Sequence, residues 1–189
     1  MKSFHLFHKE VCPEELLVYP CKDANIKPLV RRTASIFTSE PLVQAEWMKE
    51  LGAEVFVNPS DDEVTKTKIA IVLPNEITQT DESAYYEVLD YYFLILQKLV
   101  HLMKDKHNFK HIIVLLPAHS NEFSTSYSRM AYYAIYGLIQ GLGRLYAAKN
   151  LFVNGIIMNE NNPQKNLKER IQYLSADNSC NTVGQVFIL

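Results

Sequence analysis

The sequence predicts an α/β fold in which a mostly parallel sheet is covered by helices on both faces. Short apolar runs rich in Ile and Val alternate with longer segments of helical periodicity, an order typical of βαβ units. Several runs are apolar throughout, as in strands buried on both faces. The expected strands are Leu16–Tyr19, Ser35–Phe37, Glu54–Val57, Lys68–Leu73, His111–Leu116, Phe152–Met158 and Val183–Leu189.

Three helices are expected between these strands: Pro41–Leu51, Asp81–Lys104 and Ser126–Ala148. The first has Pro41 in its first turn and Gly52 just after its end, which is the usual punctuation of a helix. The second begins at Asp81, where an acidic side chain favours the helix dipole. The polar segments Asn58–Thr67 and Asn159–Asn166 are expected to be connections.

Length and composition indicate one domain covering residues 1–189, with a core of ordinary size. The net charge of −2 shows no basic excess, so we expect no nucleic-acid partner. No apolar run reaches the roughly 20 residues that span a bilayer, and charged residues interrupt the amino end, so we expect a cytoplasmic protein without a signal peptide or a membrane partner. Cys12, Cys21 and Cys180 lack CxxC spacing, which predicts reduced thiols and no metal site.

The second and third expected helices are unusually apolar. Tyr85–Met103 carries only a narrow polar stripe, and the third helix is similar. A helix that covers one face of a sheet normally exposes about half of its circumference to solvent. Either another part of the chain or a second subunit covers the outer faces, and we expect the subunit because little chain is left over.

The third expected helix and the strand after it, Tyr127–Asn159, contain a set of spaced residues: Gly137, Leu138, Leu142, Arg144, Lys149, Asn150, Val153, Asn154 and Ile156. At these positions the segment resembles the active-site helix and following strand of short-chain dehydrogenases/reductases. Tyr173–Val186 (YLSADNSCNTVGQV) is similar to the family's FLASDEASYITGQV, and Asp81–Met103 to its long helix. The closest group is the ketoacyl-carrier-protein reductases of fatty-acid or polyketide synthesis. The resemblance implies a Rossmann-like, doubly wound sheet, shortened in its first half.

The residues that the family's chemistry needs are missing. In the family a Tyr donates a proton to the carbonyl while hydride arrives, and a Lys one helical turn later lowers the pKa of that Tyr. Counting back from Val153, these positions hold Ser128 and Tyr132. The family's Asn falls near Val88, or at Tyr92 if the helix is shifted by a turn. The family's Ser falls at a Pro-Ala pair, so the resemblance implies no catalysis.

The cofactor loop of the family has also been lost. The family's first strand turns through a glycine-rich loop whose N–H groups meet the pyrophosphate of a dinucleotide. The counterpart Phe37–Pro41 has no glycine. Glu40 places a carboxylate where phosphate would lie, and Pro41 lacks an N–H. We therefore expect no bound cofactor.

These expectations together describe a catalytically deficient subunit that acts by association. In the family, the long helix and the active-site helix pack on a neighbour as a four-helix bundle. The resemblance thus implies a homodimer, a heteromer with an intact reductase, or a scaffold. The expected interface residues are Tyr92, Leu96, Leu99, Met103, Tyr133, Gly137, Gln140, Gly141 and Arg144. Gly137, Gly141 and Gly143 are expected to allow close approach of helices.

Two alternatives stay open at this point. The first is a divergent reductase that uses NADPH or NADH and a relocated tyrosine. Its catalytic residues would be Ser120, Tyr127, Ser128 and Tyr132, and its cofactor residues Thr38, Ser39 and Asn75. The second is a binder of an acyl or aromatic small molecule in the vacated site.

Overall fold

A computed structural model describes residues 29, 31–38, 43–74, 82–104, 108–116, 126–158, 164–176, 179 and 182–189. Its strands are β1 (Thr33–Phe37), β2 (Glu54–Val57), β3 (Ile69–Val72), β4 (Lys110–Leu116), β5 (Leu151–Ile157) and β6 (Val186–Ile188). Its helices are α1 (Val43–Glu50), α2 (Asp61–Lys66), α3 (Glu82–Met103), α4 (Ser126–Tyr146) and α5 (Gln164–Leu174), and a 3-10 turn, Ala147–Lys149, follows α4. The predicted strand Leu16–Tyr19 lies outside the described residues.

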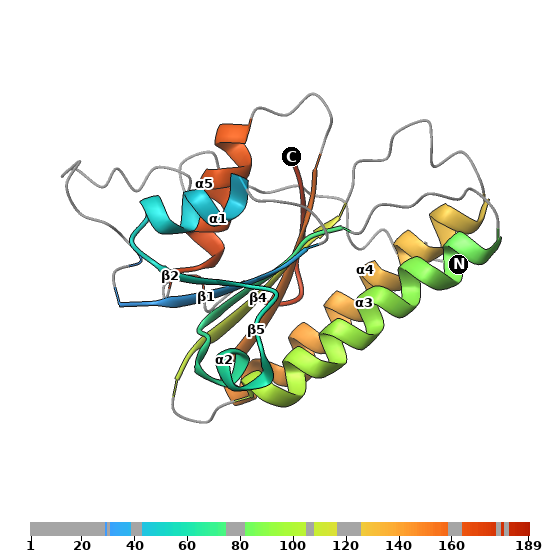
Figure 1. Ribbon diagram of the computed structural model, residues 1–189. Coiled ribbons are helices and arrows are strands. Elements are labelled where there is room, and N and C mark those ends of the chain that lie inside the picture. Colours follow the sequence, from blue (N-terminus) through green and yellow to red (C-terminus); the bar gives the residue numbers. More distant parts are fainter. Residues whose placement is uncertain are drawn as a thin grey trace, which may run out of the picture.

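The strands form one parallel sheet in the order β2-β1-β3-β4-β5-β6. From β1 the chain first adds β2 on one side. It then returns past β1 and adds β3, β4, β5 and β6 on the other side, which is the doubly wound arrangement. Helices α1 and α5 cover one face, and α3 and α4 cover the other (Figure 1). The predicted fold class is confirmed. The sheet is short on the β2 side, because the described chain passes from β2 through α2 directly to β3.

Each face of the sheet has its own core because successive strand residues point to opposite faces. In β3, Ala70 and Val72 pack with α3 and α4. Ile69 and Ile71 pack in the second cluster, which includes residues of α1 and α5. All four side chains are fully buried. This explains why β3 is apolar throughout.

Two predicted connections were wrong, because each contains helical residues. The segment Asn58–Thr67 includes α2, which begins at a capping box: the Ser60 N–H donates to the Glu63 carboxylate at 2.7 Å. The hydrogen bonds from Ser60 lower the pKa of Glu63. The Ser-x-x-Glu spacing was the missed signal.

The other predicted connection, Asn159–Asn166, ends inside α5, and this helix was not predicted at all. Most of its side chains are polar. Among the side chains of α5 that the structure describes, those of Leu167, Ile171 and Leu174 are buried against the sheet, at helical spacing. A three-residue apolar stripe was the only available signal.

Candidate functional site

The carboxyl ends of β1 and β3 form the candidate site of this fold. In a doubly wound sheet, ligands bind outside the carboxyl ends of the strands where the winding reverses. Here the reversal lies between β1 and β3, because β2 extends the sheet on one side of β1 and β3 on the other. The residues just beyond these strands, such as Thr38 and Leu73, therefore decide what the site can hold.

The side chain of Asn58 binds both backbone groups of Thr38, the residue that follows β1. Its Oδ1 accepts the Thr38 N–H at 3.0 Å, and its Nδ2 donates to the Thr38 carbonyl at 2.8 Å. Asn58 follows β2 in a left-handed conformation, φ 46°, which asparagine tolerates well. A dinucleotide fold needs free N–H groups in this turn and an acidic side chain about 20 residues later for the ribose. Asn58 lies 20 residues after Thr38, and it binds the Thr38 N–H and carbonyl with its own side chain.

Thr38 was one of the alternative cofactor residues, and it is buried. Its backbone groups are already engaged by Asn58. The other two alternatives, Ser39 and Asn75, lie outside the described residues. Sequence reasoning missed Asn58, because its role depends on the backbone conformation that brings it back to β1.

Tyrosine side chains satisfy the carbonyls at the ends of β3 and β4. The Tyr91 hydroxyl donates to the Leu73 carbonyl at 3.0 Å, and the Tyr92 hydroxyl donates to the Leu115 carbonyl at 2.8 Å. Burial raises the pKa of both tyrosines. Neither group is prepared to act as an acid near neutral pH.

The Tyr92 bond replaces a ladder bond that Pro74 cannot make. In the β3–β4 ladder, the His111 N–H donates to the Lys68 carbonyl, and the same register would pair the Leu115 carbonyl with the N–H of residue 74. Proline has no N–H. The buried tyrosine on α3 supplies the missing donor, so Tyr92 is a structural residue at the position where the shifted alignment places the family's catalytic Asn.

Tyr92→Phe is therefore expected to destabilise the fold by about 1–3 kcal/mol, because it leaves the Leu115 carbonyl buried without a donor. Tyr91→Phe is the matched control. Its hydroxyl is only part-buried, so water can replace it and we expect a loss of about 1 kcal/mol or less. Urea denaturation measures both. Equal losses would contradict this assignment.

Helix α4 carries the expected catalytic positions Tyr127, Ser128 and Tyr132, and of these three only Tyr132 has a described side chain. Tyr132, at the family's Lys position, is half-buried, and its pKa is raised by burial and by the neighbouring Tyr136 and Tyr133. A catalytic tyrosine needs the opposite shift. Tyr127 and Ser128 belong to α4, but their side chains lie outside the described part, as does Ser120.

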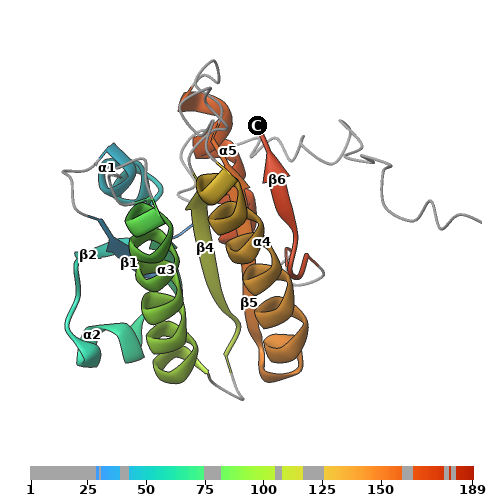
Figure 2. The same ribbon diagram turned by 90° about the vertical axis from the view of Figure 1, so that its right-hand side faces the viewer.

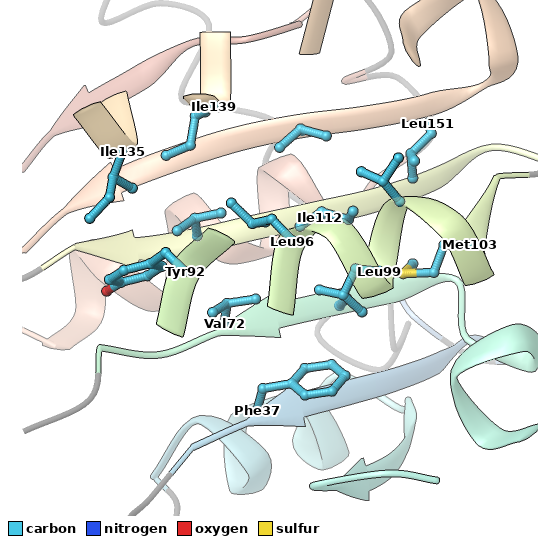
Figure 3. Close-up of a cluster of buried hydrophobic side chains, with 14 of the residues drawn as sticks. Phe37, Val72, Tyr92, Leu96, Leu99, Met103, Ile112, Ile135, Ile139 and Leu151 are labelled. Carbon is cyan, nitrogen blue, oxygen red and sulfur yellow. The ribbon is translucent and has the colours of Figure 1, made fainter. Parts of the chain in front are cut away.

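For four of the predicted interface residues, the prediction was wrong. Tyr92, Leu96, Leu99 and Met103 are at most 1% exposed. They point from α3 into the core between this helix and the sheet (Figure 3). They have no surface left for a partner. An almost wholly apolar helix does not reveal from its sequence which stripe faces its own sheet.

The predicted interface residues on α4 lie at its surface. Tyr133, Gly137, Gly141 and Arg144 are exposed, and Gln140 is half-buried. The prediction that Gly143 lets helices of two subunits approach was wrong, because Gly143 packs within its own chain. A Cβ at this position would lie 2.4 Å from the Gly184 nitrogen. Figure 2 shows α3 and α4 side by side in front of the sheet, with no described helix or strand covering them.

Large apolar side chains are exposed on this outer face. They are Tyr86, Phe93 and Leu94 on α3 and Met130, Tyr133 and Leu145 on α4, each between 48% and 66% exposed. The described part of the chain does not cover them. Within that same part, no cluster of metal-ligating side chains occurs, and no helix is long and apolar enough to cross a membrane.

Solved structures with a similar fold were found. A short-chain type dehydrogenase/reductase from Mycobacterium marinum has a TM-score of 0.68 and 14% identity, over 87% of this chain and 95% of that one. The fold is that of the short-chain dehydrogenases/reductases. A short-chain dehydrogenase/reductase from Serratia marcescens has a TM-score of 0.64 and 14% identity, over 86% of this chain and 97% of that one. BdcA from E. coli has a TM-score of 0.57 and 11% identity, over 86% of this chain and 100% of that one. No protein-family model and no curated protein sequence matches the chain.

The positions that resemble short-chain dehydrogenase/reductase motifs have structural roles here. Asn154, in the strand motif, is buried in β5; its amide donates to the Thr182 carbonyl at 2.9 Å and accepts the Gln185 N–H at 3.0 Å. Gly184, in the tail motif, has φ 63° and lies against Gln140 and Gly143 of α4. These residues fasten the last strand to β5 and α4. Retained motifs thus hold the fold together and supply no reactive group.

Proposed function

We propose that this protein is a catalytically deficient subunit with a short-chain dehydrogenase/reductase fold, which acts by association in the cytoplasm. It forms a homodimer, joins an intact ketoreductase-type enzyme as a heteromer, or serves as a scaffold. It takes neither NADPH nor NADH. Its likeness to known enzymes lies in the sheet and its helices, and the side chains that the structure describes form no tyrosine–lysine–serine constellation of the family's kind.

The double hydrogen bond between Asn58 and Thr38 is the observation that carries the proposal. Pyrophosphate binding in this fold depends on backbone N–H groups that are free to point at the ligand. Here the Thr38 N–H is taken by a side chain of the same protein. The carbonyls of Leu73 and Leu115 are likewise taken by Tyr91 and Tyr92. The groups characterised at this edge of the sheet satisfy one another.

The uncovered face of α3 and α4 supports action by association. Monomeric proteins seldom expose several large apolar side chains on one face without a partner. Leu94 and Tyr133 are 62% and 66% exposed. This face lies away from the α1–α5 face of the sheet (Figure 1), so a partner could dock there without touching α1 or α5.

A reductase assay tests the catalytic part of this proposal. We expect no oxidation of NADPH above background with a 3-ketoacyl thioester, because no tyrosine of the sequence is followed by a lysine four residues later. The variant Ser128→Tyr/Tyr132→Lys restores that pair in sequence and should also be inactive, since the Asn58–Thr38 bonds remain.

Turnover that depends on the thioester and is lost in Tyr132→Phe would contradict the proposal. It would favour the alternative, a divergent reductase with a relocated tyrosine. Tyr86→Phe is the control, because Tyr86 is exposed on α3 and neither hypothesis assigns a role to its hydroxyl.

A further inference from the structure

Strand β2 is one edge of the sheet, and no described strand lies beyond it. The strand order ends at β2, on the side opposite to β6 (Figure 2). The N–H groups of Glu54 and Asn58 donate to carbonyls in or just before β1. Because N–H groups alternate in direction along a strand, those of Val55 and Val57 point away from β1, and so do the carbonyls of these two valines.

This outer edge offers hydrogen-bonding groups over a short length. On the amino side of β2, the Ala53 N–H already donates to the Met48 carbonyl at 2.9 Å. On the carboxyl side, Pro59 has no N–H. Val55 and Val57 therefore each offer both a donor and an acceptor to a further strand. Val57 is also 41% exposed, so a further strand would cover apolar surface as well as pair the backbone.

The chain that precedes β1 joins the fold beside this edge. Leu29 is buried, and its N–H donates to the carbonyl of Leu51, three residues before β2 begins at Glu54. The predicted strand Leu16–Tyr19, which lies outside the described residues, is joined to Leu29 by residues 20–28. Nine residues span up to about 30 Å, and a further strand would lie about 5 Å beyond β2. The segment can therefore reach this edge.

We infer that Leu16–Tyr19 adds to the sheet as an antiparallel strand on β2, with Val18 paired to Val55 and Leu16 paired to Val57. In an antiparallel ladder, two residues of a hydrogen-bonded pair exchange both of their N–H···O bonds. These two pairs thus use all four outward groups of the valines. The amino-terminal segment would thereby close an edge that could otherwise pair with another chain. This inference goes beyond the proposed function and does not depend on it.

The positions that flank these pairs support the same register. The next hydrogen-bonded pair would join Pro20 to Ala53. Pro20 has no N–H to donate, and the Ala53 N–H is already bonded to Met48. The ladder can therefore end there without leaving an N–H unpaired. Between the two hydrogen-bonded pairs, Leu17 lies opposite the half-buried Phe56, and an aliphatic–aromatic pair across two strands is stabilising.

Antiparallel pairing fits the sequence better than parallel pairing. A parallel strand that placed Leu16–Tyr19 along all four residues of β2 would need an N–H from Pro20 for the Val57 carbonyl. Antiparallel pairing instead leaves Tyr19 opposite Glu54, at the end of β2 that lies near the start of the described chain. A short link also holds the segment at a millimolar effective concentration, which favours the protein's own segment over that of a second copy.

A disulfide between Tyr19→Cys and Glu54→Cys tests the register. These residues would form a non-hydrogen-bonded pair with Cα atoms about 4.5 Å apart, which is within reach of a disulfide. The full chain should also carry Cys12→Ser, Cys21→Ser and Cys180→Ser, so that no other thiol competes. After mild oxidation, we expect a cross-link within one chain, identified by non-reducing electrophoresis and peptide mass spectrometry.

The matched control is Leu17→Cys with Glu54→Cys in the same background. This diagonal pair would lie about 7–8 Å apart and should not cross-link. A cross-link in the control in place of the Tyr19–Glu54 pair would overturn the register. A cross-link formed only between two chains would overturn the assignment to the protein's own segment. The absence of a cross-link in both variants would overturn the inference as a whole.

Amide hydrogen exchange tests the pairing without added cysteines. In the unaltered protein the amides of Val55 and Val57 should be protected, and Val18→Pro should speed their exchange at least about tenfold, because it removes a ladder donor. Leu17→Pro is the control, since the Leu17 N–H would point away from β2, where proline is tolerated. Fast exchange of both valines in the unaltered protein would overturn the inference. Binding of NADPH would overturn only the proposed function.

Discussion

Gly143→Ala is expected to destabilise the protein by about 3 kcal/mol or more, the upper range for overpacking of a core. A Cβ at this position would lie 2.4 Å from the nitrogen and 2.5 Å from the Cα of Gly184, and 3.0 Å from the Val153 carbonyl oxygen. These are backbone atoms of the segment that leads into β6 and of β5. They cannot move aside by a rotamer change, so α4 would have to separate from the sheet.

Gly141→Ala is the matched control on the same helix. A Cβ there meets no atom within 4 Å, and alanine is favoured over glycine inside a helix by about 0.8–1.0 kcal/mol. This variant should be slightly more stable. Both variants should be compared by urea denaturation at the same low protein concentration, so that any self-association contributes equally. Similar stability of the two variants would show that Gly184 does not lie against α4.

Asn154→Leu is expected to cost about 2–5 kcal/mol. Leucine has the same branched arrangement of heavy atoms as asparagine, so the substitution removes both hydrogen bonds without opening a cavity. It leaves the Thr182 carbonyl and the Gln185 N–H without their partner. A polar group that is buried without a partner costs about 1–3 kcal/mol. Chemical denaturation measures the loss, and proteolysis near β6 should become faster because the last strand loses its attachment to β5.

Gln185→Ala is the control for this substitution. The bond to Asn154 uses the backbone N–H of Gln185, and the Gln185 side chain is exposed. Removing the side chain keeps the bond, so stability should change by no more than about 0.5 kcal/mol. If Asn154→Leu were equally mild, the buried asparagine would not be what fastens β6.

The central strands were predictable from sequence because a parallel strand buried on both faces is a nearly continuous run of apolar residues. The helices α3 and α4 were predictable because they are long. The polar helix α5 was not, since only Leu167, Ile171 and Leu174 mark its buried side. For α3, the sequence showed an apolar helix but not its orientation. The stripe that includes Leu96 turned out to face the sheet, and Leu94 to face outward.

At the candidate site, the sequence shows which of the family's residues are missing, but not which side chains bind the backbone groups at the strand ends. The missing glycine loop, lysine and asparagine are evident from the residues themselves. The bonds that Asn58 makes to Thr38 depend on a left-handed turn that the sequence does not specify. Likewise, the sequence shows Pro74 and Tyr92 as separate residues but not the link between them. Their connection emerges only from the register of β3 and β4, which leaves the Leu115 carbonyl without a strand donor.

Calorimetric titration with NADPH and NADH tests the central claim most directly, namely that this chain has closed the dinucleotide site with its own side chains. We predict no saturable heat and no thermal stabilisation at ligand concentrations up to about 1 mM, a limit that corresponds to a binding free energy weaker than about −4 kcal/mol. Saturable binding in the micromolar range, abolished by a substitution at Thr38 or Asn58, would contradict the account.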